Sequence, residues 1–183
     1  MAAGEIGRAM ASRAIPLIFG GGRNGLMGVL ADALLGHGGT AIGVMPRSLM
    51  DREIAHLGLT QLHLVDSMHE RKLLMAELSD GFVGLPGGAG TLDEFIEQWT
   101  WAQLGIHCKP CALLNVNGYF DPLLAMIERM ADEGFLRRAY AEMLVVEEDP
   151  GTLLDRLDAY RPPERKWRFL DAASEAALAG SGR

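Results

Sequence analysis

The sequence predicts an α/β fold in which a doubly wound parallel sheet carries helices on both faces. Short, mostly apolar runs of four to six residues alternate with helical stretches along the chain, as in parallel sheets that are buried on both sides. Two glycine-rich loops each join a predicted strand to a predicted helix, which is typical of ligand-binding loops in such sheets. Hydrophobic residues make up 49% of the chain and charged residues 22%, a balance that supplies the buried core this fold needs.

The individual elements are predicted from apolar periodicity and from the positions of Gly and Pro. The expected strands span residues 15–19, 40–45, 61–65, 81–85, 111–116 and 143–146. The expected helices span residues 5–12, 26–35, 67–79, 91–104, 122–133 and 152–160. Doubly wound domains usually open on a strand that becomes central in the sheet, whereas this chain opens on a helix. We therefore expect the first strand to be missing from this chain.

The length of the chain suits one domain followed by a tail. With 183 residues, the chain is close to the usual size of a single domain. We expect this domain to cover residues 1–161. After the segment RPPERK the composition turns to Ala, Ser and Gly, so residues 162–183 are expected to form a C-terminal surface tail.

Charge and hydropathy limit the possible partners. The net charge is −7, and Lys and Arg never cluster beyond a pair, whereas nucleic-acid binding needs a basic stripe. The first ten residues lack the apolar run of a signal peptide, and no stretch is apolar enough to span a bilayer. We therefore expect no nucleic-acid or membrane partner and a cytoplasmic location.

Cysteine and histidine give no sign of a metal or redox site. Cys108 and Cys111 form the only CxxC pair, but Cys111 opens an apolar run, which favours a packing role. The five histidines are not spaced as metal ligands, and we expect them on the surface or in turns. No metal is expected.

The first glycine loop, GGGRNG, contains a GxGxxG pattern at Gly20, Gly22 and Gly25. A dinucleotide site also needs an acid at the end of the next strand, but that strand ends in the sequence VMPR. NAD is therefore disfavoured, and no cofactor is expected. Two interpretations stay open: a tight turn that needs small residues, or contacts from Gly21 and Gly22 to a phosphate or ribose.

The second glycine loop lies in the segment LPGGAGTLDEF and leads directly into a predicted helix. Its glycines let the backbone approach a ligand closely, and the free amides of the first helical turn would point at an anion. Thr91 and Glu94 also fit a capping box, in which Glu94 would only close that first turn. Glu94 therefore either caps the helix or faces a substrate.

Arg71 stands out on the preceding helix, whose start carries a capping box of Ser67 and Glu70. Helical spacing aligns Arg71 with a row of apolar residues, namely Met68, Met75 and Leu78. A guanidinium in such a row either snorkels to solvent or is paired with an acid or a phosphate. We favour pairing, and note that Lys72 lies next to Arg71 in the chain.

The segment SMHERKLLMAELSDGFVGLPGGAGTLDEFIEQWTWAQLG resembles the core of the Lonely-guy (LOG) family, whose signature is PGGxGTxxE with an upstream MHxRK. The segments GGGRNGLMG, IGVMPRSL and GYFDPLL extend the resemblance over about residues 15–136. It implies a Rossmann-like fold and a homodimer. It also implies an N-glycosidase that hydrolyses cytokinin riboside 5′-monophosphates to free base and ribose 5-phosphate. The family's opening strand, which leads into a CGSS-like loop, is the strand expected to be missing here.

The resemblance also assigns site residues. Arg71 and Glu94 match the family's catalytic pair. Roles in substrate binding fall on Glu53, Arg71, Lys72, Gly88, Ala89, Gly90, Thr91, Leu92, Asp93 and Glu94, in addition to the first-loop candidates Gly21 and Gly22. In this context we favour a Glu94 that faces substrate over one that caps the helix.

Two other functions fit parts of the sequence. A non-catalytic nucleotide sensor of the same fold would keep the loops without the chemistry, but the intact pair of Arg71 and Glu94 favours an enzyme. Lysine decarboxylation needs a lysine that forms a Schiff base with pyridoxal phosphate. Of the three lysines only Lys72 lies near the loops, where phosphate binding suits it better, and we reject that function.

Overall fold

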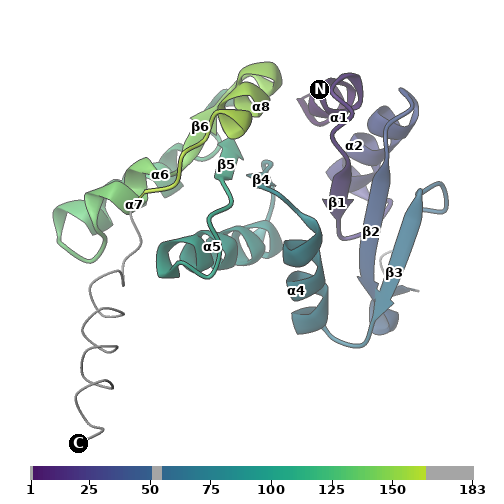
Figure 1. Cartoon of the computed structure of the whole chain (residues 1–183), viewed down its shortest axis with the longest axis horizontal. Helices are drawn as coiled ribbons and strands as arrows, with labels where there is room; N and C mark the ends of the chain where they lie inside the picture. The colour runs from purple at the N-terminus through teal and green to yellow at the C-terminus, as the bar shows by residue number, and fades with distance from the viewer. Residues whose placement is uncertain (1, 51–54, 164–183) are drawn as a thin grey trace, which may run out of the picture. The chain divides into compact units, whose positions relative to one another are not determined.

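The computed structural model describes residues 2–50 and 55–163, and in it strands alternate with helices along the chain (Figure 1). The chain divides into two units: unit 1 comprises Met1–Asp80 and Glu147–Asp158, and unit 2 comprises Gly81–Val146 and Ala159–Arg183. One domain over residues 1–161 stays a prediction. The predicted tail, residues 162–183, lies outside the described residues from residue 164 onward.

Unit 1 is built on a three-stranded parallel sheet. Its strands are β1 (Leu17–Phe19), β2 (Ala41–Pro46) and β3 (Gln61–Val65), in the order β1-β2-β3. Its helices are α1 (Ala2–Ser12), α2 (Gly25–Leu35), α4 (Met68–Leu78) and α8 (Pro150–Asp158), with a 3₁₀ turn, η1 (Arg47–Leu49). The central strand β2 is a continuous apolar run that is almost entirely buried, as a strand between two neighbours and under helices should be.

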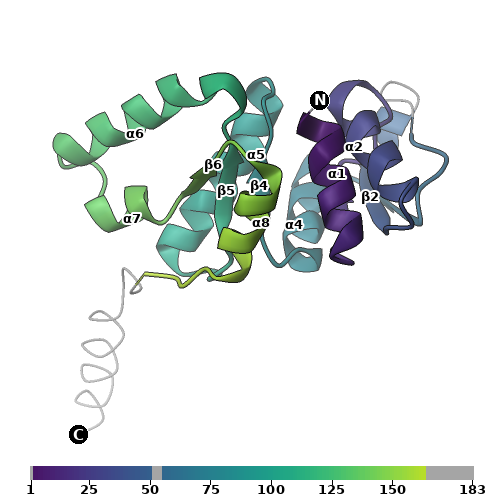
Figure 2. The same ribbon diagram turned by 90° about the horizontal axis from the view of Figure 1, so that it is seen from above.

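Unit 2 contains the second sheet, ordered β4-β5-β6. Its strands are β4 (Phe82–Gly84), β5 (Cys111–Leu114) and β6 (Val145–Glu147), whose last residue belongs to unit 1. Its helices are α5 (Ala89–Leu104), α6 (Asp121–Asp132) and α7 (Arg138–Glu142), with a 3₁₀ turn, η2 (Val116–Gly118). Strands β4 and β5 pair in parallel, and α5 packs along both of them (Figure 2).

The core of unit 2 forms between α5, β5, α6 and the segments on either side of α6. Phe95 and Trp99 of α5 are buried in one cluster with Leu113 and Phe120. The indole Nε1 of Trp99 donates a hydrogen bond to the backbone oxygen of Tyr140, at 3.0 Å. Because a buried indole N–H needs an acceptor, this bond sets the rotation of α5 about its own axis.

The predicted α/β class is confirmed, with parallel sheets flanked by helices, although the strands form two three-stranded sheets. All six predicted strands and six predicted helices occur, with ends that differ by a few residues. The sequence did not predict α7 or the two 3₁₀ turns, because five or fewer residues are too short to show periodicity. No helix among the described residues is long and apolar enough to cross a membrane.

Candidate active site

The first glycine loop of unit 1 makes room for Arg71. Arg71 lies on α4 and is only 5% exposed. A Cβ atom added at Gly20 would lie 1.7 Å from Nη2 of Arg71 and 2.9 Å from its Cζ. The guanidinium therefore packs directly on the backbone of Gly20, and any larger residue at this position would displace it.

The interpretation that Arg71 snorkels to solvent is wrong, because the side chain is buried. Its neighbours in the apolar row, Met68 and Leu78, are more exposed, at 42% and 39%. Nη1 of Arg71 lies 3.7 Å from Sδ of Met68, a weak acceptor. Lys72, the next residue of α4, is half-buried. Arg71 is thus more buried than Met68 and Leu78 of the same row, and its guanidinium packs on the backbone of Gly20.

Gly21 and Gly22 of the first loop form backbone contacts with the segment that begins at Ala55. Gly21 has a φ of +77°, a conformation that favours glycine, and its backbone oxygen accepts a hydrogen bond from the His56 amide at 2.9 Å. Gly22 forms an isolated antiparallel bridge with Ala55. Both glycines are buried, which fits a tight turn that needs small residues. Substrate contacts from Gly21 and Gly22 stay a prediction. Glu53 lies outside the described residues.

His56 was expected on the surface or in a turn, but it is buried, with 6% of its surface exposed. Its Nδ1 accepts a hydrogen bond from the Gly58 amide at 3.1 Å, and its Nε2 lies 2.9 Å from Oδ1 of Asp32. An accepting Nδ1 leaves the proton on Nε2, which then donates to Asp32. The ring thereby ties the segment that carries Ala55 to α2, and through it supports the first glycine loop.

The second glycine loop, in unit 2, ends where α5 begins. Gly88 is the N-cap, in an extended conformation (φ −85°, ψ −162°) and with no side chain to cap the helix. Ala89 and Gly90 then form the first helical positions, and they and Gly88 are exposed. The first amides of a helix have no acceptor within it and carry the positive end of its dipole. This start of α5 is therefore suited to binding an anion.

The capping-box interpretation of Thr91 and Glu94 is wrong. The helix begins at Ala89, two residues earlier than expected, so Thr91 is the third helical residue and Glu94 lies in the second turn. Thr91 packs against the loop instead: a Cβ atom at Gly87 would lie 2.3 Å from its Oγ1. Glu94, which is half-buried, does not cap the helix.

The second predicted capping box is confirmed. Oγ of Ser67 accepts a hydrogen bond from the Glu70 amide at 3.1 Å. The Glu70 carboxylate reaches back to the amide of Asp66, at 2.8 Å, one residue before the position that the motif predicts. The Ser67 side chain therefore caps the first turn of α4 through the Glu70 amide, whereas the N-cap of α5 has no side-chain hydrogen bond.

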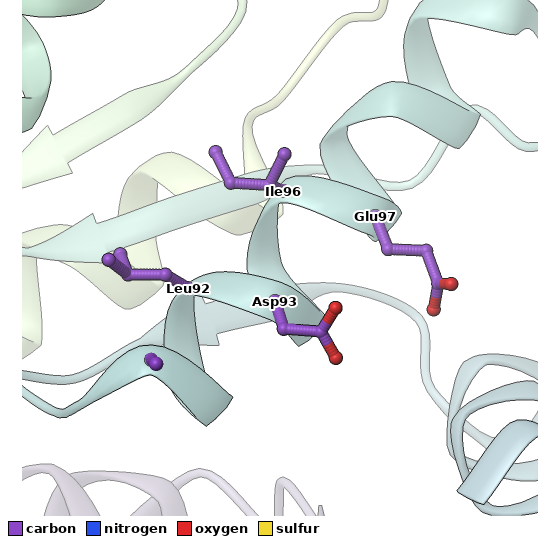
Figure 3. Close-up of a pocket in the computed structure, with 5 residues that line it drawn as sticks. Leu92, Asp93, Ile96 and Glu97 are labelled. Atoms are coloured by element: carbon purple, nitrogen blue, oxygen red, sulfur yellow. The ribbon is translucent and has the colours of Figure 1, made fainter.

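A hollow of about 490 Å³ lies along the first turns of α5. Its lining residues are Ala89, Leu92, Asp93, Ile96 and Glu97. Leu92 and Ile96 lie on one side of the helix, and the carboxylates of Asp93 and Glu97 lie on the other (Figure 3). The hollow extends one helical turn beyond the predicted substrate-binding stretch, to Ile96 and Glu97, which the sequence analysis did not include. Ile96 follows Leu92 by four residues, and Glu97 follows Asp93 by four. This helical spacing is the signal that could have identified Ile96 and Glu97.

Two further residues of unit 2 have structural roles, and for Cys111 the predicted packing role is confirmed. Gln98 of α5 is a polar residue that lies in the interior, with 5% of its surface exposed. Cys111 is fully buried at the start of β5, and burial raises the pKa of its thiol to about 12. A thiol of this kind stays protonated at neutral pH and is unreactive. Among residues 2–50 and 55–163, no three His, Cys, Asp or Glu side chains are grouped as metal ligands.

Comparisons with known proteins identify relatives over most of the chain. A family model described as "Possible lysine decarboxylase" matches residues 27–157. The cytokinin riboside 5′-monophosphate phosphoribohydrolase of Rhodococcoides fascians is 53% identical over 145 residues, which are 79% of this chain and 73% of that protein. A cytokinin riboside 5′-monophosphate phosphoribohydrolase of Arabidopsis thaliana is 44% identical over 165 residues, 90% of this chain and 78% of that protein. A probable enzyme of the same name from Oryza sativa subsp. japonica is 45% identical over 165 residues, 90% of this chain and 68% of that protein.

Solved structures share the fold at lower identity. The molybdenum cofactor binding protein of Rippkaea orientalis superposes with a TM-score of 0.64 at 19% identity, over 86% of this chain and 85% of that chain. The molybdenum cofactor carrier protein of Chlamydomonas reinhardtii gives a TM-score of 0.63 at 21% identity, over 86% of both chains. At such identities the similarity concerns the fold alone.

Proposed function

This chain belongs to the family of cytokinin riboside 5′-monophosphate phosphoribohydrolases, and we propose that it hydrolyses the N-glycosidic bond of adenosine 5′-monophosphates that carry a cytokinin base. In this reaction the C1′–N9 bond breaks, the hydroxyl of water adds to C1′, and the base leaves with a proton. The products are the free base and ribose 5-phosphate. The observation that carries the proposal is the exposed, uncapped start of α5 with a carboxylate, Glu94, in the next turn.

The 5′-phosphate is assigned to the start of α5. Gly88, Ala89, Gly90 and Thr91 would present backbone amides at the positive end of the helix dipole. Gly88 and Gly90 have no Cβ atom that could block the approach of a phosphate. The space where each Cβ would stand is open, with no neighbouring atom within 4 Å. By the family resemblance, Lys72 would add a positive charge that suits the phosphate. An anchored phosphate would fix the ribose for attack by water.

The carboxylate of Glu94 is assigned to the chemistry. Breaking the glycosidic bond builds positive charge on the ribose ring, as in other glycosidic cleavages. A fixed carboxylate beside the ring would stabilise this charge or orient the attacking water. Its position in the second turn of α5 supports this role, because the side chain is not needed to cap the helix. Leu92 and Asp93, from the same turn, would border the bound nucleotide.

The family resemblance assigns Arg71 to the same reaction, as the second member of the catalytic pair with Glu94. A guanidinium that is buried on the backbone of Gly20 has few orientations open to it, and positioning of this kind favours catalysis. Its positive charge would hold a carboxylate in the ionised form. Glu53 is proposed to contact the nucleotide by the family resemblance, as are Gly21 and Gly22.

The description of the family model as possible lysine decarboxylase implies a different chemistry. A Schiff-base lysine in a pyridoxal phosphate site would be required. Lys166 lies outside the described residues, and Lys109 follows the exposed Cys108 at the start of the β5 segment. Neither residue adjoins a glycine loop in the sequence, and the curated relatives carry the hydrolase name.

We further propose that the chain forms a homodimer and acts in the cytoplasm, where nucleoside 5′-monophosphates are made and used. The end of α5 supports the dimer: Leu104 is 39% exposed and Ile106 is 63% exposed, next to the half-buried Trp101. Apolar surface of this kind beside a site is typical of an interface.

Replacing Glu94 by Gln separates chemistry from folding. The change removes the charge and keeps the size of the side chain, so turnover of AMP or a prenylated AMP should fall roughly a hundredfold or more. The free energy of unfolding should change by no more than about 1 kcal/mol. The measurements are release of free base and a denaturant unfolding curve on the same preparations. Near-normal turnover would remove Glu94 from the mechanism, and an inactive wild-type protein that binds AMP would indicate a nucleotide sensor.

The 5′-phosphate should be essential to the substrate. Without it the amides at the start of α5 lose their anion, and positioning in the transition state is lost together with binding. We expect kcat/KM for AMP to exceed that for adenosine by about a hundredfold or more. Initial rates of adenine release from the two compounds test this, and equal rates would contradict a phosphate site.

Arg71 and Gly20 should act as one unit. Arg71→Ala removes the guanidinium, and Gly20→Ala displaces it by placing a Cβ 1.7 Å from Nη2. Both variants should lose most of the turnover, and the double variant should be no worse than Arg71→Ala alone, because the two changes remove the same contact. Gly90→Ala meets no atom within 4 Å and shows whether an added methyl group by itself disturbs folding. Full, independent losses that multiply in the double variant would refute the coupling.

The dimer is tested by mass in solution. Sedimentation equilibrium at micromolar concentration should give about twice the chain mass of 19.8 kDa. Ile106→Glu places a charge on the exposed apolar surface and should shift the protein toward monomer. A wild-type protein that sediments as a monomer would overturn the proposal.

A further inference from the structure

A tyrosine from a distant part of unit 2 binds the second glycine loop. The hydroxyl of Tyr119 donates a hydrogen bond to the backbone oxygen of Gly87, at 2.6 Å. The two residues are 32 positions apart in the chain. Tyr119 follows the 3₁₀ turn η2 and lies just before α6, and its ring is 51% exposed. The hydroxyl thus joins this turn to the loop that precedes α5.

The turn that carries Tyr119 is held in an uncommon conformation. Asn117 and Gly118 both have positive φ angles, of 53° and 68°, and only glycine adopts this conformation without cost. The amide of Asn115 bridges the two ends of the turn: its Oδ1 accepts from the Phe120 amide at 2.7 Å, and its Nδ2 donates to Asp121 at 2.8 Å. Because Asn115 is buried, these bonds fix the direction in which Tyr119 leaves the backbone.

The contact with Gly87 also orients the next amide. The peptide bond between Gly87 and Gly88 is planar and trans, so its N–H points away from its C=O. A hydrogen bond that holds the Gly87 oxygen toward Tyr119 therefore holds the Gly88 N–H in the opposite direction. A bond to the oxygen also polarises the peptide and makes its N–H a better donor.

This peptide would otherwise be free to rotate. Glycine has no side chain to restrict its backbone, and the loop has Gly at positions 87 and 88 in succession. Thr91 restrains the Cα of Gly87 from the helix side, since its Oγ1 stands 2.3 Å from where a Cβ would be. That contact does not determine the direction of the carbonyl. Tyr119 supplies this second restraint.

We propose that Tyr119 is a positioning residue for the phosphate site, and that its hydrogen bond to Gly87 holds the Gly88 amide in the direction from which it binds the 5′-phosphate. This inference rests on the proposed function, because the anion at the start of α5 is the substrate phosphate. Tyr119 acts through the loop and does not take part in the reaction at C1′. It therefore adds to phosphate affinity in the ground state and the transition state alike.

The test is Tyr119→Phe, which removes the hydroxyl and keeps the ring and its edge-to-face contact with Phe120. KM for AMP and the inhibition constant of ribose 5-phosphate should both rise roughly 3- to 10-fold, as expected for one lost hydrogen bond. Turnover at saturation should stay within about twofold, because an interaction made equally in both states changes KM and not kcat. Inhibition by free adenine, which has no phosphate, should be unchanged. A purely structural defect would alter both inhibitors.

Tyr140→Phe is the matched control. Tyr140 lies in the same unit, and its hydroxyl is buried without a hydrogen-bond partner among the described residues, so its removal should leave all four constants as in the wild type. Unchanged KM and ribose 5-phosphate inhibition in Tyr119→Phe would overturn the inference while the proposed function stands. Calorimetric titration with AMP gives the same answer if turnover is too slow to follow. A wild-type protein that neither binds nor cleaves AMP would overturn both.

Discussion

Each glycine loop is shaped by a side chain that occupies the space a Cβ atom would need. In unit 1 the guanidinium of Arg71 packs on Gly20, and in unit 2 the hydroxyl of Thr91 packs on Gly87. A methyl group at either glycine would push the side chain away. The positions of the predicted catalytic arginine and of the loop before α5 thus depend on the absence of two Cβ atoms, more than on the flexibility that glycine is usually taken to provide.

The two helices that carry the candidate residues differ in how the backbone amides at their starts are capped. At α4, Ser67 and Glu70 occupy backbone amides of their own segment, so the helix is stabilised without any ligand. At α5, the N-cap Gly88 has no side chain to offer, and the amides of the following residues are left for an anion. Arg71 therefore lies on a helix, α4, whose first turn is capped by its own segment. At α5 we propose that the substrate phosphate accepts the hydrogen bonds of the first amides.

Most of the fold could be predicted because strands and helices of ordinary length show their period in the sequence. The predicted helix over residues 91–104 is one example, and its Phe95 and Trp99 are buried in the core of unit 2. The errors have local causes. The Thr91 and Glu94 motif matched a capping box, but Gly88 began the helix earlier. His56 was expected on the surface or in a turn and is buried, because contacts from other segments enclose it.

The sequence by itself determined the class of fold, the family, and the two glycine loops with Arg71 and Glu94 near them, because these depend on residue types and on spacing along the chain. Only the tertiary structure decided that Arg71 is buried on Gly20, and that the hydroxyl of Tyr119 reaches Gly87 across 32 residues. Contacts between distant segments depend on how the backbone of each one turns, and the left-handed conformations at Asn117 and Gly118 that direct Tyr119 are set by bonds from Asn115. The spacing of residues along the chain does not predict such contacts, because each one forms only when distant segments pack together.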